Sequence, residues 1–175
     1  MKNKMWTNCP ITKKNSEILQ SWYTEDTNHT GVDVSGDTIC SICYGVVIYL
    51  GQAANKTYTV IVQYDREICV SYSNLISVYI ESGQMIKQGE LLGVCKDFVH
   101  FEYITTYKDS SIFPVRVGTQ TYYKHDPQCI IDGSVLLSGS GLENVKIIGD
   151  ATKLPIINMS PMMNEEFANS RGGDE

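Results

Sequence analysis

Two short stretches hold residues whose types and spacing could bind a metal ion. The first, "HTGVD", places His29 four residues before Asp33, with Gly31 between them. A glycine lets the backbone turn tightly, so that the imidazole and the carboxylate can converge. Both groups are suitable zinc ligands. The second stretch, "DFVHFEY", contains His100, which as a third ligand would complete a His₂Asp site with its fourth position open to water.

His100 has a second interpretation as a histidine packed into a core. Its stretch alternates like a strand, with Phe98, His100 and Glu102 on one face and Val99 and Phe101 on the other. A lone strand histidine can be packed, exposed or ligating, so spacing alone leaves these alternatives open. Glu102 lies about 7 Å further along the same face. It could orient the imidazole as a hydrogen-bond partner, or act as a general base.

The elements that must position these residues are predicted to be strands. Apolar runs rich in Val, Ile and Tyr, bounded by Gly, Asn and Asp, predict strands at 44–51, 57–65 and 67–75. Gly83, Gly89 and Gly93 divide 78–95 into short pieces with tight bends. No helical periodicity appears between 39 and 105, so we expect an antiparallel β core. The sequence also suggests one short helix at 15–23 and further short strands within 126–150.

The domain organisation expected from this pattern is a single β-domain with two irregular extensions. We predict an N-terminal extension at 1–28, the β-domain at 29–135 and a C-terminal extension or tail at 136–175.

Composition limits the classes of partner. Hydrophobic residues make up 42% and charged residues 19%, as in soluble globular proteins. The net charge of −6 argues against nucleic acid, which requires clustered Lys and Arg. The N-terminal residues contain no apolar leader segment, and no run of 18 apolar residues predicts a membrane span.

Other reactive residues have alternative interpretations. Cys40 and Cys43 form a CxxC, which is a zinc or redox signal, yet residues three apart on a strand point to opposite faces and would simply pack. His125 reads as a surface histidine before a turn at Asp126 and Pro127. The eleven tyrosines could pack on strand faces or form a stacking groove for glycan.

The order of the motifs resembles the lysostaphin-type zinc endopeptidases, which cut peptide cross-bridges in bacterial peptidoglycan. The family pattern runs H-x-G-x-D, G-x-V, Y-x-H-L, a glycine-rich segment and H-L-H-F-E. Here "HTGVD", "YGVV", "SYSNL", "SGQMIKQGELLG" and "VHFEY" follow in that order over residues 29–104. The resemblance implies a mainly antiparallel all-β fold of the barrel-sandwich hybrid type, with a groove that holds zinc. It also implies that His29, Asp33 and His100 are the three metal ligands.

Two positions depart from the family pattern. Y-x-H-L reads Tyr72-Ser73-Asn74-Leu75, and the first histidine of H-x-H is Phe98. In the family these two histidines are thought to activate the water and stabilise the oxyanion. Phe98 cannot transfer a proton, and Asn74 cannot act as a base at neutral pH. A positioned general base contributes roughly 10²–10⁴-fold, so we expect little hydrolysis.

The sequence therefore predicts a degenerate family member that keeps its zinc ligands and serves as a structural or cell-wall-binding component. The missing leader fits a phage tail or virion protein, made in the cytoplasm and assembled into the particle through its terminal extensions. Bacterial peptidoglycan is the other expected partner; nucleic acid and membranes are not. Two alternatives remain: an active zinc endopeptidase that opens the cell wall during infection, and a structural β-module without metal.

Overall fold

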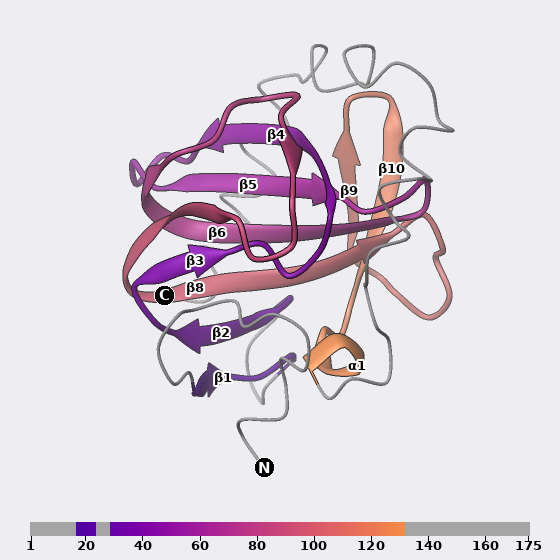
Figure 1. Ribbon diagram of the computed structural model, residues 1–175. Coiled ribbons are helices and arrows are strands. Elements are labelled where there is room, and N and C mark those ends of the chain that lie inside the picture. Colours follow the sequence, from indigo (N-terminus) through magenta and orange to yellow (C-terminus); the bar gives the residue numbers. More distant parts are fainter. Residues whose placement is uncertain (1–16, 24–28, 132–175) are drawn as a thin grey trace.

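The computed structural model describes residues 17–23 and 29–131, and antiparallel strands make up nearly all of its regular structure (Figure 1). The predicted all-β fold is therefore confirmed. The one helix among the described residues has four residues, too few to cross a bilayer. In chain order the elements are β1 (Ile18–Gln20), β2 (Val32–Ser35), β3 (Thr38–Cys40), β4 (Gly45–Gln52), β5 (Tyr58–Gln63), β6 (Ile68–Val78), β7 (Met85–Ile86), β8 (Leu91–Thr105), β9 (Pro114–Val117), β10 (Gln120–His125) and α1 (Gln128–Ile131).

Strand β8 organises the sheet because it pairs with four other strands. Along one edge it pairs with β6, from Ile68 opposite Thr105 to Val78 opposite Gly93. Its other edge is shared in succession by β3 at 91–94, β2 at 98–101 and β10 at 103–105. Residues from the start and the end of the domain therefore meet across the middle of β8, where His100 lies.

The two faces of this sheet differ in chemistry. Val99 and Phe101 of β8 join Val32 of β2 and Tyr72 of β6 in the larger apolar core. The side chains that alternate with them, including His100, are buried on the opposite face. A second apolar cluster, which includes Ile104, Val115 and Tyr122, continues that opposite face beneath the β9–β10 hairpin. The tyrosines in these two clusters are packing residues.

Two sequence predictions were wrong. Residues 18–20 form strand β1 rather than a helix, because they add to the edge of β2 with Ile18 opposite Val34. The segment at 128–131 is a helical turn rather than a strand. The Asp126 carboxylate accepts a hydrogen bond from the backbone N–H of Gln128 at 2.9 Å, and Pro127 lies immediately before the first helical residue. The strands expected at 132–150, and most of both predicted extensions, lie outside the described residues.

Candidate metal site

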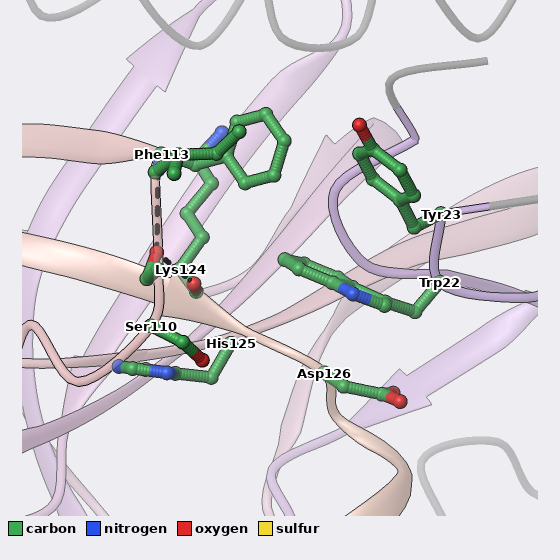
Figure 2. A pocket seen from close by; sticks show the side chains of 9 residues that line it. Trp22, Tyr23, Ser110, Phe113, Lys124, His125 and Asp126 are labelled. Atoms are coloured by element: carbon green, nitrogen blue, oxygen red, sulfur yellow. Dashed lines mark hydrogen bonds between the residues drawn. The ribbon is translucent and has the colours of Figure 1, made fainter.

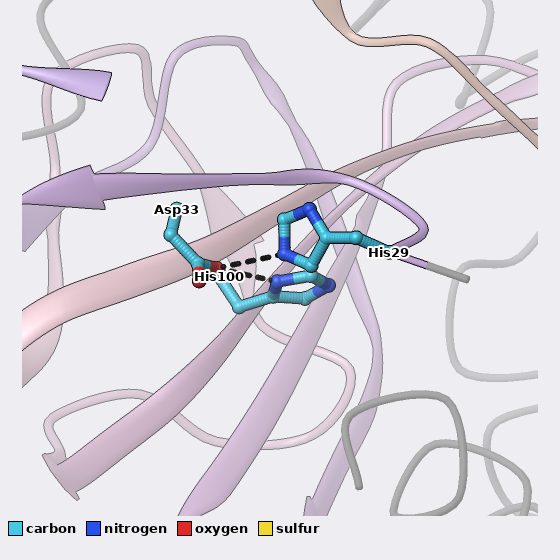
Figure 3. Close-up of side chains that lie close together, drawn as sticks. All are labelled: His29, Asp33 and His100. Atoms are coloured by element: carbon cyan, nitrogen blue, oxygen red, sulfur yellow. Dashed lines mark hydrogen bonds and ion pairs between the residues drawn. The ribbon is translucent and has the colours of Figure 1, made fainter. Parts of the chain in front are cut away.

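The structure brings His29, Asp33 and His100 together (Figure 3). One potential ligand atom from each residue lies within 4.8 Å of the other two. Asp33 Oδ1 is 3.3 Å from His29 Nε2 and 2.7 Å from His100 Nδ1. Ligands of a tetrahedral zinc about 2.0–2.2 Å from the ion are roughly 3.3–3.6 Å apart. The three side chains thus need only small shifts to share one ion.

Backbone pairing fixes this convergence. Asp33 on β2 lies directly opposite His100 on β8, and both side chains point to the same face of the sheet. His29 precedes β2, and its ring lies at 73° to that of His100 with the ring centroids 5.0 Å apart. All three residues are buried, with His29 at 0%, His100 at 2% and Asp33 at 5% exposure.

Hydrogen bonds fix which nitrogen of each imidazole faces the carboxylate. His29 Nδ1 lies 2.8 Å from the carbonyl oxygen of Ser21, which can only accept, so Nδ1 carries the proton and Nε2 faces Asp33. His100 Nε2 lies 3.0 Å from the Thr30 carbonyl oxygen and 3.0 Å from Glu102 Oε1. Both partners of Nε2 are acceptors, so Nε2 carries the proton and Nδ1 faces Asp33.

This arrangement requires a cation between the two rings and Asp33. If both imidazoles were neutral, their inner nitrogens would direct lone pairs at an ionised carboxylate oxygen, which is repulsive. A proton on His100 Nδ1 removes the repulsion between that ring and Asp33, whereas a metal ion would remove it for both rings. The outer N–H groups are already held by a carbonyl or a carboxylate, which is how metal-bound histidines are oriented in proteins. The residues therefore fit a metal ion in both geometry and donor chemistry.

The titration properties of the site follow from the same contacts. Burial disfavours the charged forms of Asp33 and His100, but the hydrogen bonds between the side chains favour those charged forms more strongly. Burial would raise the pKa of Asp33, yet His100 and His29 lower it to about 2. Burial would likewise lower the pKa of His100, whereas Asp33 and Glu102 raise it to about 9. Without metal, the proton on His100 is the cation that the carboxylate needs.

Gly31 has a role beyond the turn expected from the sequence. Its φ of +133° favours glycine. A Cβ at this position would lie 2.7 Å from the Phe101 carbonyl oxygen, 2.9 Å from Glu102 Cγ and 2.9 Å from His100 Nε2. The glycine of "HTGVD" thus leaves room for the hydrogen bond between His100 and Glu102.

A buried ion pair lies behind His100. Glu102 Oε1 accepts hydrogen bonds from Thr30 Oγ1 at 3.1 Å and lies 3.2 Å from Lys124 Nζ. Glu102 is 1% and Lys124 is 2% exposed. Burial would raise the pKa of Glu102, but the ammonium of Lys124 and then His100 lower it to about 2. Glu102 is therefore an ionised partner of the outer nitrogen of His100, on the far side of the ring from Asp33.

The sequence motifs do not predict a role for Lys124 or Thr30 at this site. The available signal was alternation within "QTYYKH", where Tyr122 and Lys124 fall on the same face of a strand. A lysine at an inward position needs a buried acid. Which acid it meets depends on the pairing of β10 with β8, which the spacing of the motifs does not reveal.

The positions that depart from the family pattern lie beside the site. Phe98 is two residues before His100 on the same face of β8. Asn74 adopts φ 68° where the β6–β8 register shifts, and its Nδ2 donates a hydrogen bond to the Phe98 carbonyl oxygen at 2.9 Å. Asn is favoured in this conformation, so Asn74 closes a bulge in the ladder.

The remaining histidine and the CxxC pair lie outside this site. His125 Nε2 lies 2.9 Å from Thr105 Oγ1 and 2.8 Å from the Tyr107 carbonyl oxygen. Cys40 ends β3, and Cys43 packs in the larger apolar core. The structure therefore groups neither His125 nor the cysteines with the three candidate ligands.

Comparison with known families supports the resemblance seen in the sequence. Residues 27–110 match Peptidase family M23, and no curated protein sequence matches the chain. These residues form an M23 domain of the lysostaphin type. The match contains all three candidate ligands, together with Asn74, Phe98 and Glu102. Lys124 lies beyond its C-terminal limit.

Solved structures share the fold of this M23 domain. The antimicrobial peptidase lysostaphin from Staphylococcus simulans matches with a TM-score of 0.52 and 16% identity, covering 74% of this chain and 52% of that chain. LytU matches with a TM-score of 0.51 and 18% identity, covering 69% and 87%. A chain of the SpoIIQ–SpoIIIAH pore-forming complex matches with a TM-score of 0.50 and 17% identity, covering 70% and 87%.

The buried ion pair predicts a large effect of Lys124→Met. This change leaves the Glu102 carboxylate buried without its ammonium partner, so the free energy of unfolding should fall by about 3–5 kcal/mol. Urea denaturation at pH 7 measures the loss. Lys96→Met, at an exposed position of β8, is the control and should change stability by less than about 0.5 kcal/mol. Equal losses in the two variants would contradict a stabilising role for the pair.

The depressed pKa of Glu102 predicts acid sensitivity. Its pKa of about 2 in the folded protein is below the ordinary 4.5, so its contribution is present above pH 4.5 and is lost as the pH falls towards 2. The stability difference between metal-free wild type and Glu102→Gln should shrink by on the order of 3 kcal/mol over that interval. The exposed substitution Glu81→Gln should leave the acid limb of the stability curve unchanged. A constant difference between wild type and Glu102→Gln would refute the assignment.

Proposed function

We propose that this M23 domain holds zinc between His29, Asp33 and His100, has lost most of its hydrolytic activity, and acts as a cell-wall-binding or structural module. The convergent donor set and the preset imidazole tautomers support the metal. When bound there, zinc would supply a Lewis acid. The chain's own residues provide the ligands and their orientation.

The observation that carries the loss of activity is the state of the polar groups around the three ligands. Glu102, the candidate substitute base, is ionised, ion-paired with Lys124 and directed at the outer nitrogen of His100. The amide of Asn74 is hydrogen-bonded to the backbone of Phe98. Among the described residues, no further histidine lies at the site, since His125 bonds to Thr105 and Tyr107. The positions where the family places its two other histidines thus lack a proton-transfer group.

A binding or structural role is consistent with the different roles of proteins that share this fold. Lysostaphin is described as an antimicrobial peptidase, whereas the SpoIIQ–SpoIIIAH complex is described as pore-forming. The fold therefore occurs both in an enzyme and in a protein assembly. Assignment of the chain to a phage particle stays a prediction from the sequence, and mass spectrometry of purified particles would test it.

Metal content tests the zinc part of this proposal. Purified wild-type protein should retain one zinc ion per chain after dialysis, measured by inductively coupled plasma mass spectrometry. His29→Ala and Asp33→Asn should each reduce zinc to well below stoichiometric content, because each removes one of three protein ligands. His125→Ala is the matched histidine control and should retain zinc. Wild type without zinc, or equal zinc in all variants, would refute the site.

Release of new amino termini from purified peptidoglycan tests the loss of hydrolysis. Zinc-loaded wild type should release no more than His29→Ala. The double variant Asn74→His/Phe98→His should gain activity, because a positioned base contributes roughly 10²–10⁴-fold. Histidine tolerates the positive φ at residue 74.

Two results would count against this assignment. Zinc-dependent release by the wild type that His29→Ala abolishes would establish the alternative, an active endopeptidase. A double variant that folds, binds zinc and remains inert would show that the missing histidines do not account for the loss.

A further inference from the structure

A pocket of about 320 Å³ is lined in part by Lys124, the ion-pair partner of Glu102 (Figure 2). It is formed by three segments that are distant in the sequence: the turn after β1, the segment before β9 and the end of β10. Its size is at the lower end of the range of roughly 300–1,000 Å³ for small-molecule sites. Its lining includes Trp22, Tyr23, Ser110, Phe113, Lys124 and Asp126.

Three aromatic rings line one side of this pocket. Trp22 meets Phe113 edge-on, with the ring centroids 5.8 Å apart and the planes at 86°. The ring of Tyr23 lies 5.9 Å from Phe113 at 51°. Tyr23 is half exposed although it is a large aromatic residue. The rings thus form an angled apolar wall that is open to solvent.

Polar groups surround the aromatic wall. The indole N–H of Trp22 can donate a hydrogen bond, and the hydroxyls of Tyr23 and Ser110 can donate or accept one. Asp126 adds a carboxylate, one oxygen of which caps Gln128 at 2.9 Å. The second carboxylate oxygen can accept from a ligand hydroxyl.

The charges disfavour an anionic ligand. Lys124 lines the pocket, but its ammonium lies 3.2 Å from Glu102 Oε1 and so is neutralised by the metal-site network. The exposed carboxylate of Asp126 would repel phosphate or carboxylate groups. A neutral ring with one apolar face and a hydroxylated edge matches the pocket best. Pyranose sugars have that structure.

We propose that this pocket binds one N-acetylated hexosamine ring of a glycan strand. The C–H face of the sugar stacks on Trp22 and Tyr23, and its hydroxyl and acetamido groups bond to Ser110 and Asp126. This inference rests on the proposed function, because it names the part of the cell wall that the domain contacts.

The pocket is connected to the metal site by short contacts. The Tyr23 backbone N–H donates to the His29 carbonyl oxygen at 2.8 Å, and Lys124 reaches Glu102, the partner of His100. A bound sugar would therefore lie directly beside the metal-binding residues, as expected if both contact one peptidoglycan strand.

Tryptophan fluorescence tests the proposal directly. The chain has two tryptophans, so Trp6→Phe in the full chain leaves Trp22 as the only one. Titration with the N-acetylglucosamine tetramer should give a saturable change in Trp22 emission. Tyr23→Leu should weaken binding about 2- to 10-fold, as expected for the loss of one aromatic contact. Tyr79→Leu, which replaces a similarly exposed tyrosine outside the pocket, should not weaken it.

A second test uses two variants at exposed aspartates, which leave the apolar core unchanged. Asp126→Asn should weaken binding of the tetramer, whereas Asp109→Asn, an exposed position outside the pocket, should not. Removal of zinc with a chelator separates this inference from the metal proposal, since the metal-free wild type should bind the tetramer with unchanged affinity. Three results would overturn the inference. The first is the absence of a saturable change in Trp22 emission, and the second is equal affinity of the pocket and control variants for the tetramer. The third is saturable binding of the cation tetramethylammonium by a pocket that does not bind the sugar.

Discussion

Burial of His100 between two carboxylates is the constraint on which the rest of the domain depends. Asp33 faces one ring nitrogen and Glu102 the other, at 2.7 and 3.0 Å. Buried carboxylates must be paired with cations or strong donors. Lys124 provides the cation at one end, and a proton or a metal ion must provide it at the other. The network therefore couples the chemistry of the site to the stability of the sheet.

Strand β8 makes this network possible. Its length lets β2 and β10 deliver Asp33 and Lys124 to one face around His100 and Glu102. The other face is continuous apolar core. Successive side chains of a strand point to opposite faces, so β8 carries the apolar core on one face and the polar site on the other. The same strand that anchors the hydrophobic core thus carries the polar site, and a register shift would disrupt both.

How much of this site could be predicted depends on how far apart in the sequence the contacting residues lie. His29, Gly31 and Asp33 form a local motif, and the alternation around His100 identified the correct face, so motif order was enough to group them. Lys124 joins through β10, and Trp22 and Phe113 meet across the fold. Such tertiary pairings leave no periodic signal. The same limit applies to β1, where the sequence suggests a helix, because the strand conformation comes from pairing with β2.

Anomalous X-ray diffraction at the zinc absorption edge, on crystals of the zinc-loaded protein, would show whether His29, Asp33 and His100 share one ion. We expect one strong peak bonded to His29 Nε2, an Asp33 carboxylate oxygen and His100 Nδ1, at about 2.0–2.2 Å. Glu102 and Lys124 should remain paired behind the imidazole in that crystal. A zinc peak elsewhere, such as at Cys40 and Cys43, or no peak between the three residues, would contradict the account.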